Sequence, residues 1–171
     1  MQSVIHDLKY RGNKQLAFEM GVLLGKKILE HNCDLPDVII PIPLHKKRKR
    51  QRGYNQAGII AKGISSVIGV DVEENLLIRS NYTNTQTKKT REERKRNLRN
   101  AFSLNERLIS RYNGNHFMIV DDVFTTGATI CSGMEAFTAK IKGEFSVACL
   151  AYTGEPWDWE CSYLKSLAFL P

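Results

Sequence analysis

One run of residues, from Met118 to Thr129, constrains the fold of this chain more than any other part of its sequence. The stretch His116–Val120 is apolar without alternation, which is typical of a strand buried on both faces of a parallel sheet. Two adjacent carboxylates, Asp121 and Asp122, follow it, and a turn of hydroxyl and small residues then opens a helix at about Thr129. The run therefore predicts a strand–turn–helix unit of an α/β fold.

The same run has the chemistry of a sugar-phosphate site. Two adjacent ionised carboxylates repel each other, so a folded protein places them where hydrogen-bond donors or a cation compensate them. Small residues and hydroxyls at a helix start let backbone N–H groups and the helix dipole bind a phosphate. These residues are Thr125, Thr126, Gly127, Ala128 and Thr129. In one interpretation, the carboxylates bind the ribose hydroxyls and the turn binds the 5′-phosphate. In the alternative, the segment is an ordinary helix start capped by Asp121 or Asp122.

Composition favours a single domain over residues 1–171. The chain is 42% hydrophobic, enough for one core at this length. It contains no apolar run near the roughly 20 residues of a membrane helix and no signal peptide, so we expect no membrane span and a cytoplasmic location.

The four cysteines are scattered, without metal-ligand spacing. We therefore expect neither zinc nor a disulfide framework, and a reducing compartment.

The positive charge is concentrated in two stretches. The formal net charge is +7, yet Lys46–Arg52 holds six basic residues and no acid. Lys88–Arg99 holds seven basic residues and two acids. Without these two stretches the chain would be acidic, so the basicity indicates a local polyanionic partner. For any single lysine of Lys46–Arg50, a solvated loop that only adds solubility is the simpler interpretation.

Hydrophobic periodicity predicts alternating helices and strands. The helices are predicted over Lys14–Glu30, Tyr54–Ile68 and about Thr129–Lys140, with one or two helical turns in Arg91–Leu98; the strands over Asp37–Leu44, Leu76–Arg79, Ala101–Leu104, His116–Val120 and Phe145–Tyr152. Alternation of this kind gives a mostly parallel sheet with helices on both faces. Ligands of such sheets bind at the carboxyl ends of the strands. Asn81–Thr90 is polar and aperiodic and is predicted as a loop; Gly154–Pro171 is either a docked tail or an oligomer contact.

The run around the acid pair resembles the signature of type I phosphoribosyltransferases, which binds 5-phosphoribosyl-1-pyrophosphate (PRPP). Three further stretches are similar to the ComF family of phosphoribosyltransferase-like proteins, which is linked to natural DNA uptake in bacteria. They are His6–Gly12, Pro41–Leu44 with Arg52–Gln56, and Gln86 with Arg94, Asn97, Ala101 and Phe102. The resemblance runs from about Ile5 to Tyr152. The cysteine-rich zinc segment that ComF proteins usually carry ahead of it has no counterpart here, so the chain is either a short member or truncated.

This resemblance implies a type I phosphoribosyltransferase fold with a flexible hood at about residues 80–103. It implies Mg²⁺ bound through PRPP, and no zinc. Asp121, Asp122 and Arg52 would be catalytic, and the run Asp121–Asp122 with Thr125–Thr129 would bind the phosphoribose. The pyrophosphate would be bound by Arg52, Gly53, Lys88, Lys89 and Arg91, since a guanidinium grips phosphate oxygens with two hydrogen bonds. Some purine-salvage relatives have an aspartate as candidate base where this chain has Thr125, which cannot take that role.

Two functions follow from these observations. The first is a phosphoribosyltransferase that transfers phosphoribosyl from PRPP to a nitrogen nucleophile. The second is a non-enzymatic competence module that contacts single-stranded DNA or protein partners, with the basic stretches for phosphates and Tyr54 and Tyr82 for stacking. The sequence leaves ribose 5-phosphate as a further ligand and a homo-oligomer open.

Overall fold

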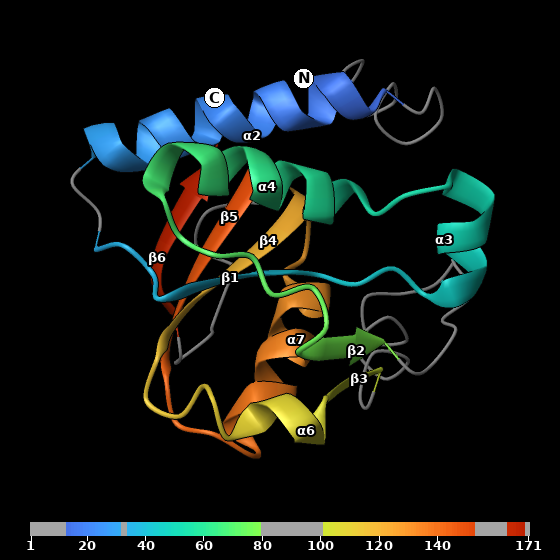
Figure 1. Cartoon of the computed structure of the whole chain (residues 1–171), viewed down its shortest axis with the longest axis vertical. Helices are drawn as coiled ribbons and strands as arrows, with labels where there is room; N and C mark the ends of the chain where they lie inside the picture. Colours follow the sequence, from blue (N-terminus) through green and yellow to red (C-terminus); the bar gives the residue numbers. More distant parts are fainter. Residues whose placement is uncertain (1–12, 32–33, 80–100, 153–163, 170–171) are drawn as a thin grey trace.

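A parallel sheet lies at the centre of the molecule. The computed structural model describes residues 13–31, 34–79 and 101–152, together with the backbone of residues 164–169. Within this part, four strands pair in the order β1–β4–β5–β6, and all neighbours are parallel (Figure 1). They are β1 (Val38–Pro41), β4 (His116–Phe124), β5 (Glu144–Tyr152) and β6 (Leu164–Phe169). The predicted α/β fold with a parallel sheet is confirmed.

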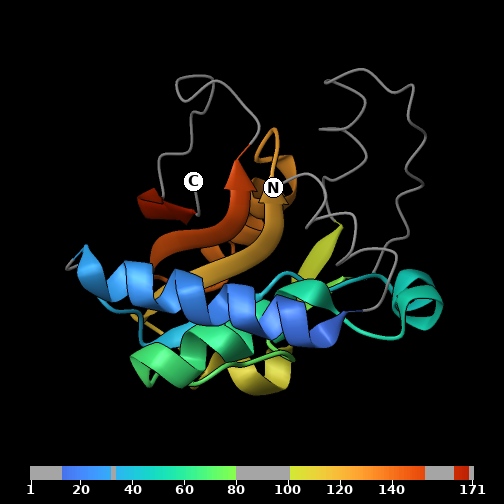
Figure 2. The same ribbon diagram turned by 90° about the horizontal axis from the view of Figure 1, so that it is seen from above.

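Helices cover both faces of this sheet (Figures 1 and 2). Helices α2 (Lys14–Glu30) and α4 (Gln56–Ile68) pack on one face, where Met118 and Val120 of β4 point. Helix α7 (Ala128–Thr138) packs on the other face, where Phe117 and Ile119 point. Successive side chains of β4 point to opposite faces of the sheet, and both faces are buried. The part of the strand before the acid pair is therefore apolar without alternation, as predicted.

Helices α2 and α4 approach each other more closely than side chains would allow. A Cβ atom on Gly63 would lie 2.3 Å from the carbonyl oxygen of Phe18. A Cβ atom on Gly21 would lie 2.2 Å from the carbonyl oxygen of Ile60. Both clashes are with backbone, which cannot rotate away, so the two glycines set the distance between the helices.

A short antiparallel ribbon packs beside α7. Strand β2 (Leu77–Arg79) pairs with β3 (Phe102–Leu104), and helix α6 (Glu106–Ile109) follows. The side chains of Leu77 and Phe102 belong to the same core as Ile130 and Met134 of α7. The chain between the two strands, residues 80–100, lies outside the described residues, and with it most of the predicted hood, the predicted loop and the predicted turns of Arg91–Leu98.

The structure differs from the sequence-based prediction at several element boundaries. The basic run was predicted as a loop, but it forms helix α3 (Lys46–Arg52). Strand β1 is shorter than predicted, whereas β4 continues through the acid pair to Phe124. The terminal segment contributes β6, which was not predicted. No helix in the described ranges is long and apolar enough to cross a membrane.

Candidate functional site

The acid pair lies where β4 extends beyond its neighbour β1. The last bond between the two segments runs from the amide of Ile42 to the carbonyl of Val120, over 2.8 Å. Pro43 comes next and has no N–H to continue the ladder. On the other side β4 stays paired with β5, with Asp121 opposite Cys149. Asp121 and Asp122 are therefore held firmly along one edge and are half-buried rather than enclosed.

The residues after the acid pair form the start of a helix suited to an anion. Gly127 is the N-cap of α7 with φ of 68°, a left-handed conformation that favours glycine. Its carbonyl accepts the Cys131 amide at 2.8 Å, which begins the helical ladder. Thr125 is exposed, while Thr126 and Thr129 are half-buried. The structure thus brings the predicted phosphate residues together at the carboxyl end of β4, with the positive end of α7 among them.

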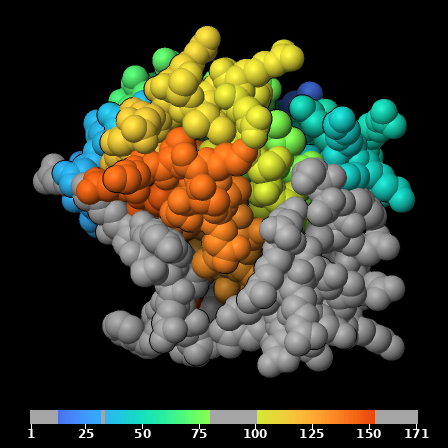
Figure 3. Space-filling model, turned by 90° about the horizontal axis from the view of Figure 1, so that it is seen from below, coloured from blue at the N-terminus to red at the C-terminus, as the bar shows by residue number. Residues whose placement is uncertain are grey.

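Helix α3 has two faces of different character. Arg48 and Arg52, four residues apart, are half-buried, whereas its other four cations, Lys46, Lys47, Lys49 and Arg50, are exposed. Figure 3 shows α3 (teal) at the rim of the molecule, beside the green and yellow surface of β2 and β3. We call the first pair the inner arginines and the four others the outer cations. Sequence reasoning selected Arg52 but missed Arg48; the helical spacing of the two was the available signal.

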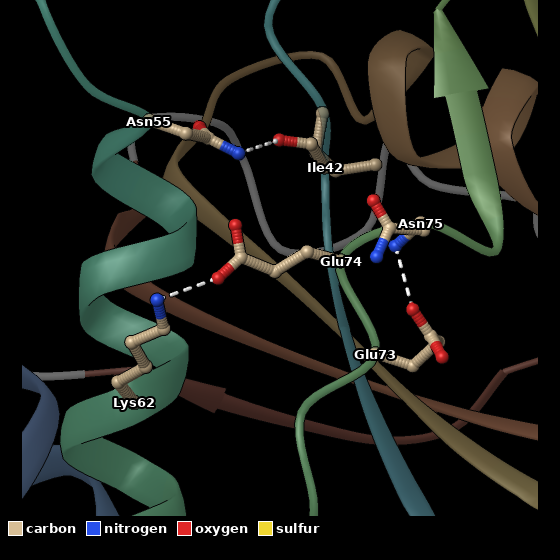
Figure 4. A network of polar contacts seen from close by, with 6 residues as sticks. All are labelled: Ile42, Asn55, Lys62, Glu73, Glu74 and Asn75. Carbon is tan, nitrogen blue, oxygen red and sulfur yellow. Dashed lines mark hydrogen bonds and ion pairs between the residues drawn. The ribbon is translucent and has the colours of Figure 1, made fainter.

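The ends of the α3 segment are fixed to the core. The Asn55 side chain donates a hydrogen bond to the carbonyl of Ile42 over 3.1 Å (Figure 4), and Asn55 is also the N-cap of α4. Gln56 is buried and accepts a long hydrogen bond of 3.4 Å from Arg52. Burial raises the pKa of Tyr54, and the positive charge of Arg52 opposes that rise. Gln56 and Tyr54 therefore help to position Arg52.

The same close-up shows how the next helix and the ribbon are joined. Lys62 of α4 forms an ion pair of 2.7 Å with Glu74, and Glu73 accepts the Asn75 amide at 2.8 Å (Figure 4). Glu73 also accepts a hydrogen bond of 3.3 Å from the Tyr112 hydroxyl. The segment that leads into β2 is thus anchored from two sides.

Arg79, the last residue of β2, belongs to the site but was not selected from the sequence. Burial lowers its pKa, the positive charge of Arg48 lowers it further, and the negative charge of Asp121 raises it. The charges of Arg48 and Asp121 therefore both act on Arg79. Charges of both signs thus act on one another near the end of β4, a charge pattern suited to a ligand with phosphates and hydroxyls.

Sequence comparison then places the chain among known proteins. It is 32% identical over 157 residues to the DNA utilization protein YhgH of Shigella flexneri, a match covering 90% of this chain and 67% of that protein. It is 37% identical over 102 residues to competence protein F of Haemophilus influenzae, covering 58% of this chain and 43% of the relative. The chain belongs to the ComF family. It spans about two thirds of the length of YhgH.

Further comparisons give a more distant relative and solved structures of similar fold. Competence protein ComFC of Bacillus subtilis is 28% identical over 134 residues, covering 76% of this chain and 50% of that protein. No protein-family model matches the sequence.

The B. subtilis glutamine PRPP amidotransferase superimposes with a TM-score of 0.50 at 19% identity, over 77% of this chain and 26% of that one. A Staphylococcus aureus hypoxanthine phosphoribosyltransferase also gives 0.50, at 14% identity, over 90% and 73%. This likeness shows the type I phosphoribosyltransferase fold.

A buried thiol, Cys149, lies beside the acid pair, opposite Asp121 on the neighbouring strand β5. Burial raises the pKa of Cys149 to about 12; the negative charge of Asp121 adds to the rise, and a backbone hydrogen bond from Phe124 opposes it. An unfolded thiol ionises near pH 8.5. The contribution of Cys149 to the free energy of unfolding is therefore complete below about pH 8.5 and is lost as the pH rises toward 12.

We expect Cys149→Ala to flatten the alkaline loss of stability. The measurement is urea unfolding of both proteins at about pH 8, 9 and 10. The slopes of the free energy of unfolding against pH are compared, because the smaller side chain also lowers stability at every pH. A variant whose stability declines as steeply as that of the wild type would show that the thiol does not titrate in this way.

Several predicted residues stay untested by the structure. Lys88, Lys89 and Arg91 lie outside the described residues. Within the described ranges no three His, Cys, Asp or Glu side chains cluster in a way that could hold a metal, and the expectation of no zinc remains a prediction.

Proposed function

We propose that this chain binds PRPP with Mg²⁺ at the carboxyl ends of β1 and β4 and transfers its phosphoribosyl group to a nitrogen nucleophile. The observation that carries the proposal is the meeting of opposite charges there. Half-buried Asp121 and Asp122 lie near the end of β4. The negative charge of Asp121 and the positive charge of Arg48 both act on Arg79. A ribose with phosphates at both ends needs this combination of acceptors and cations.

Each part of the site has a role in that reaction. The acid pair accepts hydrogen bonds from the ribose 2′- and 3′-hydroxyls and so orients C1. The turn from Thr125 to Thr129 binds the 5′-phosphate through backbone N–H groups and hydroxyls. The inner arginines neutralise the pyrophosphate as it leaves with the electron pair of its bond to C1.

The carboxylate and phosphate oxygens at this site suit Mg²⁺, which prefers hard oxygen ligands and keeps several of its waters. When bound with PRPP, the ion would supply further charge neutralisation to the leaving group. Thr125, three residues after Asp122, has a hydroxyl and offers no base there. The nucleophile must therefore arrive already basic, or meet a base from another part of the protein.

Titration calorimetry of PRPP with Mg²⁺ tests this proposal. We expect saturable, magnesium-dependent binding, and Arg52→Ala should weaken it roughly 10- to 100-fold, the loss of a charge-assisted hydrogen bond or two. Neutralising Lys46, Lys47 and Lys49 to glutamine is the control, because these outer cations are exposed and screened. The triple variant should change PRPP affinity by less than about threefold. Wild-type protein that fails to bind PRPP would contradict the proposal.

A second candidate function is favoured by the outer cations themselves. They lie exposed on one short helix, and the related YhgH proteins are named for DNA utilization. In this function the outer cations contact the backbone of single-stranded DNA. The same triple variant should then weaken single-strand binding and flatten its salt dependence, by a slope of roughly 0.7 for each lost phosphate contact. Unchanged affinity and slope would leave this function without support from α3.

A further inference from the structure

Helix α3 presents positive charge on two sides. Arg48 and Arg52 on its inner side are half-buried, whereas the outer cations are exposed. No residue of α3 is buried, so the core does not need these side chains. An α-helix with its side chains is about 10–12 Å across. A polyanion on the outer side would therefore lie one helix width from a pyrophosphate on the inner side.

Hydrogen bonds connect the end of α3 to the acid pair. Asn55, three residues after α3, donates to the Ile42 carbonyl over 3.1 Å. The Ile42 amide donates to the Val120 carbonyl over 2.8 Å, and Asp121 follows Val120. The outer cations are therefore carried by a segment that is fixed to the strand of the proposed ribose site.

Lys14, the first residue of α2, extends the exposed positive charge onto a second element. Its Nζ lies 5.7 Å from the centre of the Tyr54 ring, a cation–π contact that restrains the ammonium group. Tyr54 follows Gly53, the C-cap of α3, and is only 6% exposed. Its ring therefore supports Lys14 and is too enclosed to stack on a base, which corrects the predicted stacking role of Tyr54. Figures 1 and 2 show the start of α2 and helix α3 on the same side of the molecule. We call Lys14 and the outer cations together the cationic surface.

The hydroxyl of Thr125 favours a nucleophile that needs no base. A nitrogen that must lose a proton during transfer depends on a base, whereas the unprotonated ring nitrogens of adenine, cytosine and guanine have a free lone pair. Such a lone pair forms the bond to C1 as the pyrophosphate leaves with the electrons of its own bond to C1. No proton is transferred, and the modified base carries the positive charge.

We propose that the nitrogen nucleophile is an unprotonated ring nitrogen of a base in single-stranded DNA, whose phosphates bind the cationic surface. This inference rests on the proposed function, and it joins the two candidate functions into one reaction. Exposed cations bind the backbone of a single strand whatever its sequence. A base in a single strand can also enter a site without the cost of leaving a duplex.

Transfer of label from PRPP to an oligonucleotide tests the proposal. The full chain is incubated with Mg²⁺, PRPP labelled in its ribose, and oligodeoxyadenylate, and the label and mass of the strand are measured. We expect phosphoribosyl groups to be added to the strand. Oligothymidylate should bind but accept none, because thymine in DNA has no unprotonated ring nitrogen. Transfer to oligothymidylate would overturn the proposal, as would a kcat/KM for deoxyadenosine monophosphate equal to that for the strand.

Variants of the cationic surface test how the strand is held. Lys14→Gln should raise the KM for oligodeoxyadenylate roughly 2- to 5-fold, and the triple variant of the outer cations roughly 10-fold or more. Each lost phosphate contact should also reduce the salt dependence of KM by a slope of roughly 0.7. Lys26→Gln removes an exposed charge further along α2 and should leave KM unchanged. Unchanged KM values in both Lys14→Gln and the triple variant would overturn the proposal.

Calorimetry with PRPP and Mg²⁺ separates this inference from the proposed function. A wild type that does not bind PRPP contradicts both. A wild type that binds PRPP but adds no label to oligodeoxyadenylate contradicts the inference alone, because the donor site then serves another nucleophile.

Discussion

Replacing Asp121 and Asp122 together by asparagine should weaken PRPP binding by at least roughly 100-fold, the largest effect we expect at the site. Each carboxylate accepts a hydrogen bond from a ribose hydroxyl in the proposed complex, and charge-assisted bonds of this kind contribute about 1.5–3 kcal/mol each. Asparagine keeps the size of the side chain but removes the charge. The measurement is calorimetry with PRPP and Mg²⁺.

Inorganic pyrophosphate with Mg²⁺ is the ligand that makes this test specific. It has no ribose hydroxyls, so the double variant should bind it at least as well as the wild type, because the negative charge of Asp121 no longer acts on Arg79. The fold should persist, since both aspartates are only half-buried and β4 is held by its bonds to β5. Undiminished PRPP affinity in a folded double variant would show that the acid pair does not bind the ribose.

Gly63→Ala should lower the free energy of unfolding by about 3 kcal/mol, at the upper end of the usual cost of overpacking. The added Cβ would lie 2.3 Å from the Phe18 carbonyl oxygen, so α2 and α4 must separate. Separation disturbs the apolar contacts along both helices, including those of Leu24 and Ile64. The measurement is urea unfolding followed by circular dichroism.

Gly58→Ala provides the matched control in the same helix. There the added Cβ would lie 3.4 Å from its nearest neighbour, Glu74 Oε2, which is an ordinary contact. Alanine also favours the helix over glycine, so this variant should be neutral or more stable by up to about 1 kcal/mol. If Gly63→Ala proves as stable as Gly58→Ala, the close approach of the helices is not the constraint we describe.

Apolar periodicity was sufficient to predict the main elements of the fold. Helix α2 has the predicted bounds, Lys14–Glu30, because its buried residues recur at helical spacing and Asn13 caps its start. Strand β5 begins one residue earlier than predicted. The acid pair was found because it directly follows a strand without alternation, a pattern that lies within a few neighbouring residues.

Helix α3 was not predicted because the same method depends on apolar residues, and α3 has none. The signals that were present are of a different kind. Lysine, arginine and glutamine are good helix formers. The His45 side chain accepts the Lys47 amide at 3.2 Å, and Gly53 ends the helix with φ of 79°. Propensity and capping therefore determine this helix, without a buried face.

Arg48 and Arg79 were missed for a different reason, because their positions depend on tertiary packing. Nothing adjacent to Arg79 in the sequence distinguishes it from other arginines, since Phe102 is its partner across a ribbon and Asp121 belongs to a different sheet. Its role depends on how β2 packs against α7, which is tertiary information. The same holds for Arg48, whose half-buried position is set by the orientation of a helix that periodicity does not detect.

The hydrogen bond between Asn55 and Ile42 closes a loop of chain around α3. The chain between Ile42 and Asn55 leaves and re-enters the core at the same point. Lengthening this loop would therefore raise the entropic cost of closing it only slowly. Related chains could therefore exchange α3, lengthening it or reversing its outer charge, while the strand before it and the helix after it stay in register. Because α3 has no buried residue, its replacement would disturb the core little.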